Sequence, residues 1–307
     1  MTTPLRHDVY PCSFDALTVN DIRSVNVSPS VSHMVMIPGG ATRPDGFAMN
    51  YADPTISITT GDIATVLGST GVATGLSVSG ATWEIQYEKR ASGGTYAGTL
   101  SHVTLNGTDG FLYVTSISAE QDSAEGASLD ATFVALSGGA SPGYTAPFSV
   151  NTSQTLTGTP DVPLRHALGP VYCNGSLIAG VQSVKIDPGI KHEAKRSDGG
   201  VFPTACVVVE QQPMVEVSVL NPALVDESTL GPFISALSGS GIVVYLQAVS
   251  PGGGRVASGT GSHVSFTSAT GVWAVTSQNG TARGDVVTTF QAKLTAAISV
   301  STTATIP

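Results

Sequence analysis

Short runs in which apolar and polar residues alternate recur along the whole chain, and this pattern is typical of β-strands with one buried face. One example is Trp-Glu-Ile-Gln-Tyr-Glu at 83–88, whose apolar residues fall on one side of the predicted strand and whose polar residues fall on the other. Further strands are predicted around Val25, Ile56, Val184, Val215 and Val244, and over residues 102–105, 111–115, 130–136, 263–266, 272–276 and 287–294. The pattern therefore predicts an all-β protein.

The same pattern occurs twice along the chain. Pro-Leu-Arg-His occurs at 4–7 and again at 163–166, and the six histidines form three pairs, separated by 159 residues early in the chain and by 161 later. Phe133 aligns with Phe290, and Cys12 with Cys173. Such internal similarity indicates duplication. We expect tandem repeats at 1–138 and 161–307, joined by an extended linker at 139–160 that is rich in Gly, Ser, Thr and Pro.

Each repeat is expected to be a β-sandwich or barrel of six to eight strands with one short helix. Asp62 and Asn221 stand at equivalent places before helix-compatible residues, and both side chains favour the N-cap position. Polar loops are expected at 33–51 and 192–205, since each contains an Asp-Gly turn signal.

Charge is sparse and unevenly distributed. Charged residues make up 11% of the chain and the formal net charge is −9. Residues 1–150 hold five Lys and Arg against thirteen Asp and Glu, whereas residues 151–307 hold eight against nine. This balance argues against tight binding of nucleic acid by phosphate neutralisation. The first ten residues are polar and the apolar runs are short, so neither a signal peptide nor membrane insertion is expected.

No constellation for chemistry stands out. Each histidine has a counterpart in the other repeat, which favours structural roles over one active site. The three cysteines, Cys12, Cys173 and Cys206, are expected in the core. No nucleophile elbow, phosphate loop or metalloprotease motif is present. We therefore expect no catalytic residue, cofactor or metal. The basic cluster from Lys185 to Arg196 favours a contact between subunits over a nucleic-acid patch.

One family resemblance emerges from these strands. Residues 171–186, Val-Tyr-Cys-Asn-Gly-Ser-Leu-Ile-Ala-Gly-Val-Gln-Ser-Val-Lys-Ile, and the continuation from Lys195 to Val219 resemble the opening strands of bacteriophage tail tube proteins. The shared order is a strand pair, a projecting loop with Asp-Gly, a strand and a helix. Both repeats follow it, so the resemblance covers most of the chain.

The resemblance implies a fold shared with baseplate hub domains and type VI secretion tubes. In that family, sheets from six domains close a ring, and rings stack into a tube that conducts DNA. Three duplicated chains would form a trimeric ring with pseudo-sixfold symmetry. It further implies a non-enzymatic virion tail protein, assembled in the bacterial cytoplasm. The implied partners are other copies of the chain, the tape-measure protein, tail terminator and baseplate proteins, and double-stranded DNA in passage.

Two groups of residues follow as candidates. Polar residues on predicted strands are candidates for a channel lining: Ser57, Thr59, Glu84, Gln86, Glu88, Glu216, Ser218 and Gln247. Charged residues of the two loops are candidates for contacts between rings: Arg43, Asp45, Lys191, Lys195, Arg196 and Asp198.

Three other interpretations stay open at the level of sequence. A baseplate or hub protein would share the duplicated fold without stacking into tubes. A two-domain adhesin or carbohydrate-binding protein would be monomeric and would expose aromatic residues for sugar stacking, yet the chain has only Trp83 and Trp273. A β-rich hydrolase would need a catalytic constellation, and none is visible.

Overall fold

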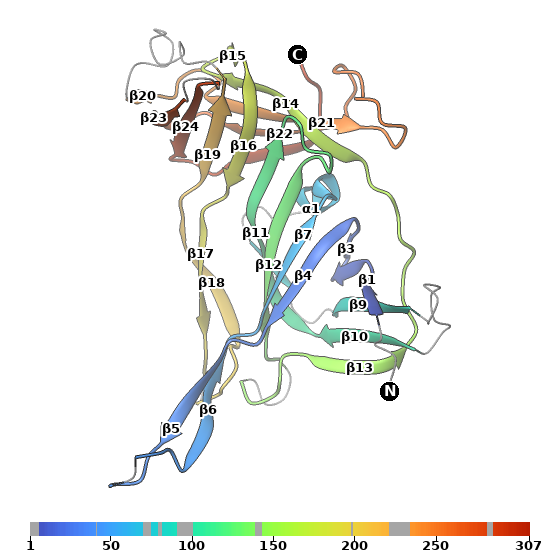
Figure 1. Ribbon diagram of the computed structural model, residues 1–307, viewed down its shortest axis with the longest axis vertical. Coiled ribbons are helices and arrows are strands. Elements are labelled where there is room, and N and C mark those ends of the chain that lie inside the picture. The colour runs from blue at the N-terminus through green and yellow to red at the C-terminus, as the bar shows by residue number, and fades with distance from the viewer. Residues whose placement is uncertain are drawn as a thin grey trace.

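The chain folds into β-sheets arranged in two layers, with one hairpin (residues 31–52) that projects away from the layers and a second (residues 190–211) that packs on one of the sheets (Figure 1). The computed structural model describes residues 6–40, 42–69, 75–78, 82–90, 101–138, 143–197, 199–220, 234–280 and 285–307. The expectation of an all-β protein is confirmed, since helix α1 (Ile63–Gly68) is the one α-helix among these residues.

The elements of the first repeat precede residue 155. They are β1 (Arg6–Val9), β2 (Cys12–Phe14), β3 (Leu17–Val19), β4 (Ile22–Ser28), β5 (Val31–Met36), β6 (Gly46–Ala52), β7 (Thr55–Thr60), α1, β8 (Leu76–Val78), β9 (Trp83–Arg90), β10 (His102–Gly107), β11 (Asp109–Glu120), β12 (Ser128–Leu136) and β13 (Ser149–Gln154).

The elements of the second repeat follow residue 164. They are β14 (Arg165–Cys173), β15 (Ser176–Ile178), β16 (Val181–Asp187), β17 (Ile190–Lys195), β18 (Ala205–Gln211), β19 (Met214–Val219), β20 (Ile234–Ala236), β21 (Ile242–Val249), β22 (His263–Ser268), β23 (Gly271–Asn279), β24 (Val287–Leu294) and β25 (Ser299–Ala304).

One ten-stranded antiparallel sheet runs through both repeats. Its order is β4-β7-β12-β11 in the first repeat, followed by β16-β19-β24-β23-β20 in the second, with β8 also paired to β11. Strands β4 and β16, β7 and β19, β12 and β24, and β11 and β23 occupy equivalent places. The registers agree: Val25 lies opposite Ile58, and Val184, 159 residues on, lies opposite Val217.

The similarity between the two repeats extends to irregularities of the backbone. The β4–β7 ladder shifts register between Ile22 and Ser24, and the β16–β19 ladder shifts between Val181 and Ser183. Positive φ angles also recur 159 residues apart, in the pairs Asp15 and Asn174, Asp21 and Gly180, and Ser30 and Gly189. Few residue types adopt this conformation readily, so the shared positions support the duplication inferred from sequence.

A smaller sheet covers one face of the large sheet in each repeat. The orders are β3-β2-β9-β10-β13, with β1 also on β9, and β15-β14-β21-β22-β25. Strand β13 lies inside the segment expected to be a linker at 139–160, so that linker was predicted too long. β13 is a polar edge strand without apolar alternation, which is why the sequence pattern missed it. The connection that remains runs from β13 to β14 along the outside of the molecule (Figure 1).

The segments expected as polar loops are hairpins. β5 pairs with β6, and β17 pairs with β18, each with a register shift after the second residue pair. The expectation was wrong because it followed the Asp-Gly signals and gave no weight to the alternating Val, Met and Phe residues on either side. Asp198 of the second turn lies outside the described residues.

Helix α1 begins directly after Asp62, as the sequence predicts. The Asp62 side chain makes no capping bond to the helix. It is buried, and its Oδ2 atom accepts a hydrogen bond from the backbone N–H of Asn20 at 3.1 Å. The helix expected after Asn221 lies outside the described residues.

The two repeats fill the space between their layers with differently placed aromatic rings. In the first repeat Phe133 packs against Phe14 and Trp83, with ring centroids 5.0 Å apart in both pairs. In the second repeat Trp273 stacks on Phe290 at 4.9 Å. All five rings are fully buried and belong to one continuous core.

The strand registers correct two equivalences drawn from sequence. Phe133 lies opposite Ile56, whose counterpart Val215 lies opposite Ala292, so Phe133 corresponds to Ala292 and not to Phe290. Cys173 pairs with Ser176 as Phe14 pairs with Leu17, so Cys173 corresponds to Phe14 and not to Cys12. A slip of two residues preserves the buried face of a strand, so apolar alternation alone could not detect either error.

The aromatic packing leads to a stability test. We expect Phe133→Ala to lower the free energy of unfolding by about 3–5 kcal/mol, because it removes a fully buried ring and leaves a cavity. Urea denaturation followed by circular dichroism measures the change. Met34→Ala, at a residue 54% exposed, is the control and should stay within about 0.5 kcal/mol of the wild type. A cost below about 1 kcal/mol for Phe133→Ala would contradict the packing.

A histidine pair gives a pH test. Burial lowers the pKa of His166 and the nearby His263 lowers it further, while the backbone of Ser262 opposes the shift. The unfolded chain therefore binds more protons than the folded chain below pH 6.5, and stability should fall as the pH drops through that region. We expect His166→Phe to weaken this dependence. His7→Phe, at the equivalent but exposed position, should leave it unchanged; equal slopes for all three proteins would contradict the assignment.

Candidate assembly interface

The junction between the two repeats is a ladder between unlike strands. β11 of the first repeat pairs antiparallel with β16 of the second, with Ile117 opposite Ile186 and Glu120 opposite Ser183. Among the described strands, β4, the counterpart of β16, pairs only with β7. Gln278 and Asn279 of β23 correspond to Ile117 and Ser118 in the joined part of β11, and they pair only with β24 among the described strands. Within the described residues, the large sheet therefore keeps one open edge of each kind that meets at the junction.

A helix and a strand strengthen this junction on the core side. Leu67 of α1 and Ile117 of β11 meet Ile186, Phe266 and Val300 of the second repeat around a cavity of about 10 Å³. The register places Val150 of β13 where β25 has Val300, and Val150 is 59% exposed. The first repeat thus exposes the counterpart of an apolar residue that the second repeat partly buries against its core.

The hairpin β17–β18 extends the junction across the opposite face of the large sheet. Ile190 and Cys206 of the hairpin pack on a cluster formed by Phe111, Tyr113 and Val134 of the first repeat. His192 lies on Tyr113, with ring centroids 4.8 Å apart. Burial under the hairpin raises the pKa of Tyr113, and burial lowers the pKa of His192 against a smaller opposing effect of Asp53.

The turn of this hairpin reaches the base of the other hairpin. The Arg196 guanidinium lies 4.5 Å from the ring centroid of Tyr51 and pairs with Asp53. Ala52 donates its backbone N–H to the carbonyl of Val201 at 2.9 Å, and Ser137 donates to Pro203 at 2.8 Å. Arg196, a candidate for contacts between rings, is therefore engaged inside the chain.

The other candidates for ring contacts occupy two places. Arg43 and Asp45 are exposed in the turn of β5–β6, which projects away from the two layers (Figure 1). Lys191 and Lys195 are exposed on β17, where they pair with Glu210 and Glu193.

Half of the channel candidates share the polar face of the large sheet. Ser57 and Thr59 lie on β7, and Glu216 and Ser218 occupy the equivalent positions on β19. Most of this face beyond the hairpin carries small hydroxyl side chains. Its charged residues have both signs: Glu120, Asp130, Lys185, Asp187, Glu216 and Lys293.

Hydrogen bonds hold these side chains in rows across the strands. Asp130 accepts bonds from the Thr59 hydroxyl at 2.7 Å and the Ser116 hydroxyl at 2.8 Å, so it links three neighbouring strands. Thr289 takes the place of Asp130 in the second repeat and lies 3.3 Å from the Ser218 hydroxyl.

The remaining channel candidates lie on the smaller sheets. Glu84, Gln86 and Glu88 belong to β9, and Gln247 belongs to β21. Gln86 is 2% exposed and donates to the carbonyls of Pro11 and Thr157, both at 3.1 Å. The structure therefore does not bring all eight candidates to one surface.

Sequence reasoning missed the residues under the hairpin. Phe111, Leu112, Tyr113 and Val134 are all buried, although Leu112 faces the core between the layers and the others face the hairpin. The signal was available, because Phe-Leu-Tyr-Val at 111–114 is apolar in both phases and indicates a strand covered on both faces.

Other features of the described residues do not form a chemical site. Burial raises the pKa of the Cys12 thiol to about 12 and those of Cys173 and Cys206 to about 11. In this part of the chain no three metal-ligating side chains come together, and no helix is long and apolar enough to cross a membrane. No protein family model matches the sequence, and no curated protein matches it either. Function is therefore inferred from the geometry of the interface.

The hairpin contact can be tested locally. We expect Tyr113→Ala to accelerate trypsin cleavage after Lys195 and Arg196 by about fivefold, because losing an aromatic contact of about 1 kcal/mol favours opening of the hairpin. Mass spectrometry of the fragments measures the rate at each site. Thr115→Ala, on the same strand face but outside the cluster, is the control. Unchanged cleavage in Tyr113→Ala would contradict the docking.

Proposed function

We propose that the protein is the subunit of a bacteriophage tail tube. Chains join head to tail, with the free β23 edge of one chain pairing with the free β4 edge of the next. Three chains, and hence six repeats, close a ring, and rings stack into a hollow tube. The role is structural and not catalytic.

The observation that carries this proposal is the junction inside the chain. It joins a β11-type edge to a β16-type edge, and the same two types of edge are left at the ends. A contact between unlike surfaces is heterologous, and repetition of such a contact gives a ring or a filament. Closure also pairs edges that otherwise favour aggregation. By equivalence with the internal ladder, Gln278 of one chain lies opposite Val27 of the next, and Asn279 lies opposite Asn26.

The polar face of the large sheet supports a channel. We propose that Ser57, Thr59, Glu216 and Ser218 line it, because hydroxyl groups in hydrogen-bonded rows expose few fixed charges to a passing polyanion. Double-stranded DNA and the tape-measure protein pass without strong binding. Tail terminator and baseplate proteins cap the two ends of the tube, and the protein resides in the virion tail after assembly in the bacterial cytoplasm.

The alternative of a carbohydrate-binding module is disfavoured by the tryptophans. Trp83 and Trp273 are fully buried in the core, so neither offers a face for sugar stacking. A hub protein with the same fold differs from a tube subunit only in its stacking, so it is an outcome of the test below.

Assembly of the purified chain tests the proposal. We expect sedimentation velocity to show a species of three 31.1 kDa chains and negative-stain images to show rings and tubes with a central channel. Val27→Asp should abolish this assembly while the monomer stays folded, because closure would bury an unpaired carboxylate at a cost of several kcal/mol. Asn26→Asp, whose side chain lies on the polar face, is the matched control.

Two results would contradict the proposal or part of it. A wild-type chain that stays monomeric at high concentration, with folded circular dichroism, contradicts it entirely. Single rings that never stack keep the head-to-tail contact but favour the hub over the tube.

A further inference from the structure

The two hairpins share a backbone but differ in their surroundings. Their strands pair in the same register with the same shift, and their turns have the same length. β17–β18 lies on the first repeat of its own chain, whereas β5–β6 projects away from the layers (Figure 1). Val35 and Phe47 of β5–β6 are 49% and 65% exposed. An apolar surface of this kind usually marks an interaction site.

Near the turn of the hairpin, the occupied contact places small residues on large ones, whereas Ile190 and His192 pack on the sheet nearer the base. The hairpin contributes Ala194 and Cys206, which lie opposite each other on the face that packs on the sheet. The sheet contributes Phe111 and Tyr113, which are nearly fully buried beneath them. The small side chains of this hairpin, here called slim, and the large rings of the sheet surface beneath it, here called a bulky seat, together fill the space between hairpin and sheet.

The vacant contact reverses these sizes. By register, Val35 and Phe47 take the places of Ala194 and Cys206. On the large sheet, Val272 and Ala274 of β23 take the places of Phe111 and Tyr113. A bulky hairpin therefore corresponds to a shallow seat. Val272 is 40% exposed where Phe111 is 5% exposed, so the seat on the second repeat is uncovered within the chain.

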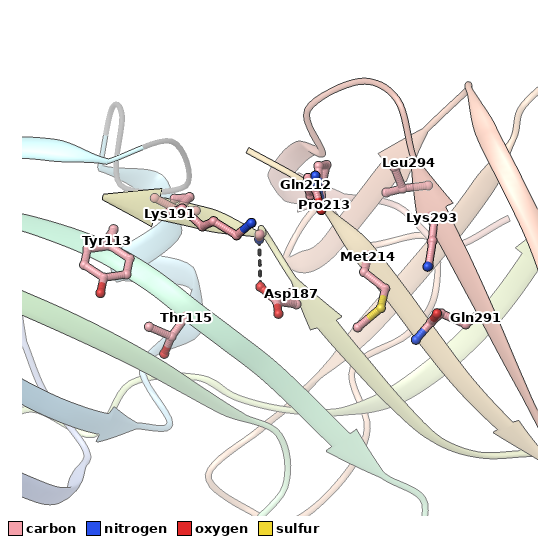
Figure 2. A pocket seen from close by; sticks show the side chains of 12 residues that line it. Tyr113, Thr115, Asp187, Lys191, Gln212, Pro213, Met214, Gln291, Lys293 and Leu294 are labelled. Carbon is pink, nitrogen blue, oxygen red and sulfur yellow. Dashed lines mark hydrogen bonds between the residues drawn. The ribbon is translucent and has the colours of Figure 1, made fainter. Parts of the chain in front are cut away.

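A groove adjoins the uncovered seat. Gln291, Lys293 and Leu294 of β24 form one wall, and Lys191 and Gln212 at the base of β17–β18 form another, around a volume of about 890 Å³ (Figure 2). Lys293 occupies the position of Val134, which the docked hairpin covers in the first repeat. The groove also reaches Tyr113 and Thr115 of β11, so it lies between the surface covered by the docked hairpin and the uncovered surface of β23 and β24.

We propose that the β5–β6 hairpin of one chain lies on β23 and β24 of the next chain, with Phe47 against Ala274 and Val272. This inference rests on the proposed head-to-tail assembly and adds to it a rule for pairing. Residue sizes match the bulky hairpin to the shallow seat and the slim hairpin to the bulky seat. The partner is a second copy of this chain, because the uncovered hairpin and the uncovered sheet surface are the counterparts of a hairpin and a sheet surface that already pack together inside the chain.

A cycle of two substitutions tests the pairing. Phe47→Ala should raise the concentration needed for half-assembly by about tenfold or more in sedimentation velocity, because the apolar contact of Phe47 with Val272 and Ala274 is lost. Ala274→Tyr should weaken assembly as well, because Tyr and Phe47 would compete for the same space. The double variant recreates the slim hairpin on the bulky seat, and it should return to within about threefold of the wild type.

Met34→Ala is the matched control. Met34 is 54% exposed on the same hairpin, but it lies on the opposite face, where β17 carries Glu193. It should leave assembly unchanged. Circular dichroism of each monomer should match the wild type, since Phe47 and Met34 are exposed and Ala274 lies on the outer face of the sheet.

The outcomes separate this inference from the proposed function. If wild-type chains form rings and Phe47→Ala assembles equally well, the hairpin contact is wrong and the tube proposal stands. If both single variants weaken assembly and the double variant is weaker still by the sum of the two effects, Phe47 does not meet Ala274 and the pairing rule is overturned. If wild-type chains do not associate at all, the proposed function itself fails.

Discussion

Backbone hydrogen bonding at the edges of the large sheet is the constraint on which the rest of the structure depends. An edge strand leaves N–H and C=O groups that favour pairing with another strand. The β11–β16 ladder satisfies one such pair of edges inside the chain. The duplication leaves the complementary edges open among the described strands: β4 at one end of the sheet, and at the other end the part of β23 beyond the three residues that pair with β20. The proposed head-to-tail assembly follows from this arrangement, because the chain already contains one example of the contact that it would form with its neighbours.

The two repeats have kept their backbone and changed their side-chain volumes. Register shifts and left-handed backbone positions recur 159 residues apart. In the core, Phe133 is replaced by Ala292, and Leu112 by Trp273. Interiors are densely packed, so such exchanges must compensate each other locally. At the hairpins the same kind of exchange leaves one contact filled and its counterpart open.

The sequence allowed the strands and the duplication to be predicted, but not the neighbours of each strand. Alternation distinguishes the two faces of a strand and does not say which sheet it joins, so Glu84, Gln86 and Glu88 could not be separated from Ser57 and Thr59. Strand β13 lacks alternation because both its faces are largely exposed. The hairpin contact joins residues about 80 positions apart, such as Tyr113 and His192, and a local pattern does not reveal such a contact.

A cryo-electron microscopy reconstruction of the self-assembled protein tests the central claim most directly, since it would resolve the boundary between chains. We expect the large sheet to continue across that boundary, with β23 antiparallel to β4 and Gln278 opposite Val27. An assembly in which both edges face solvent, or in which two identical edges meet, would contradict it.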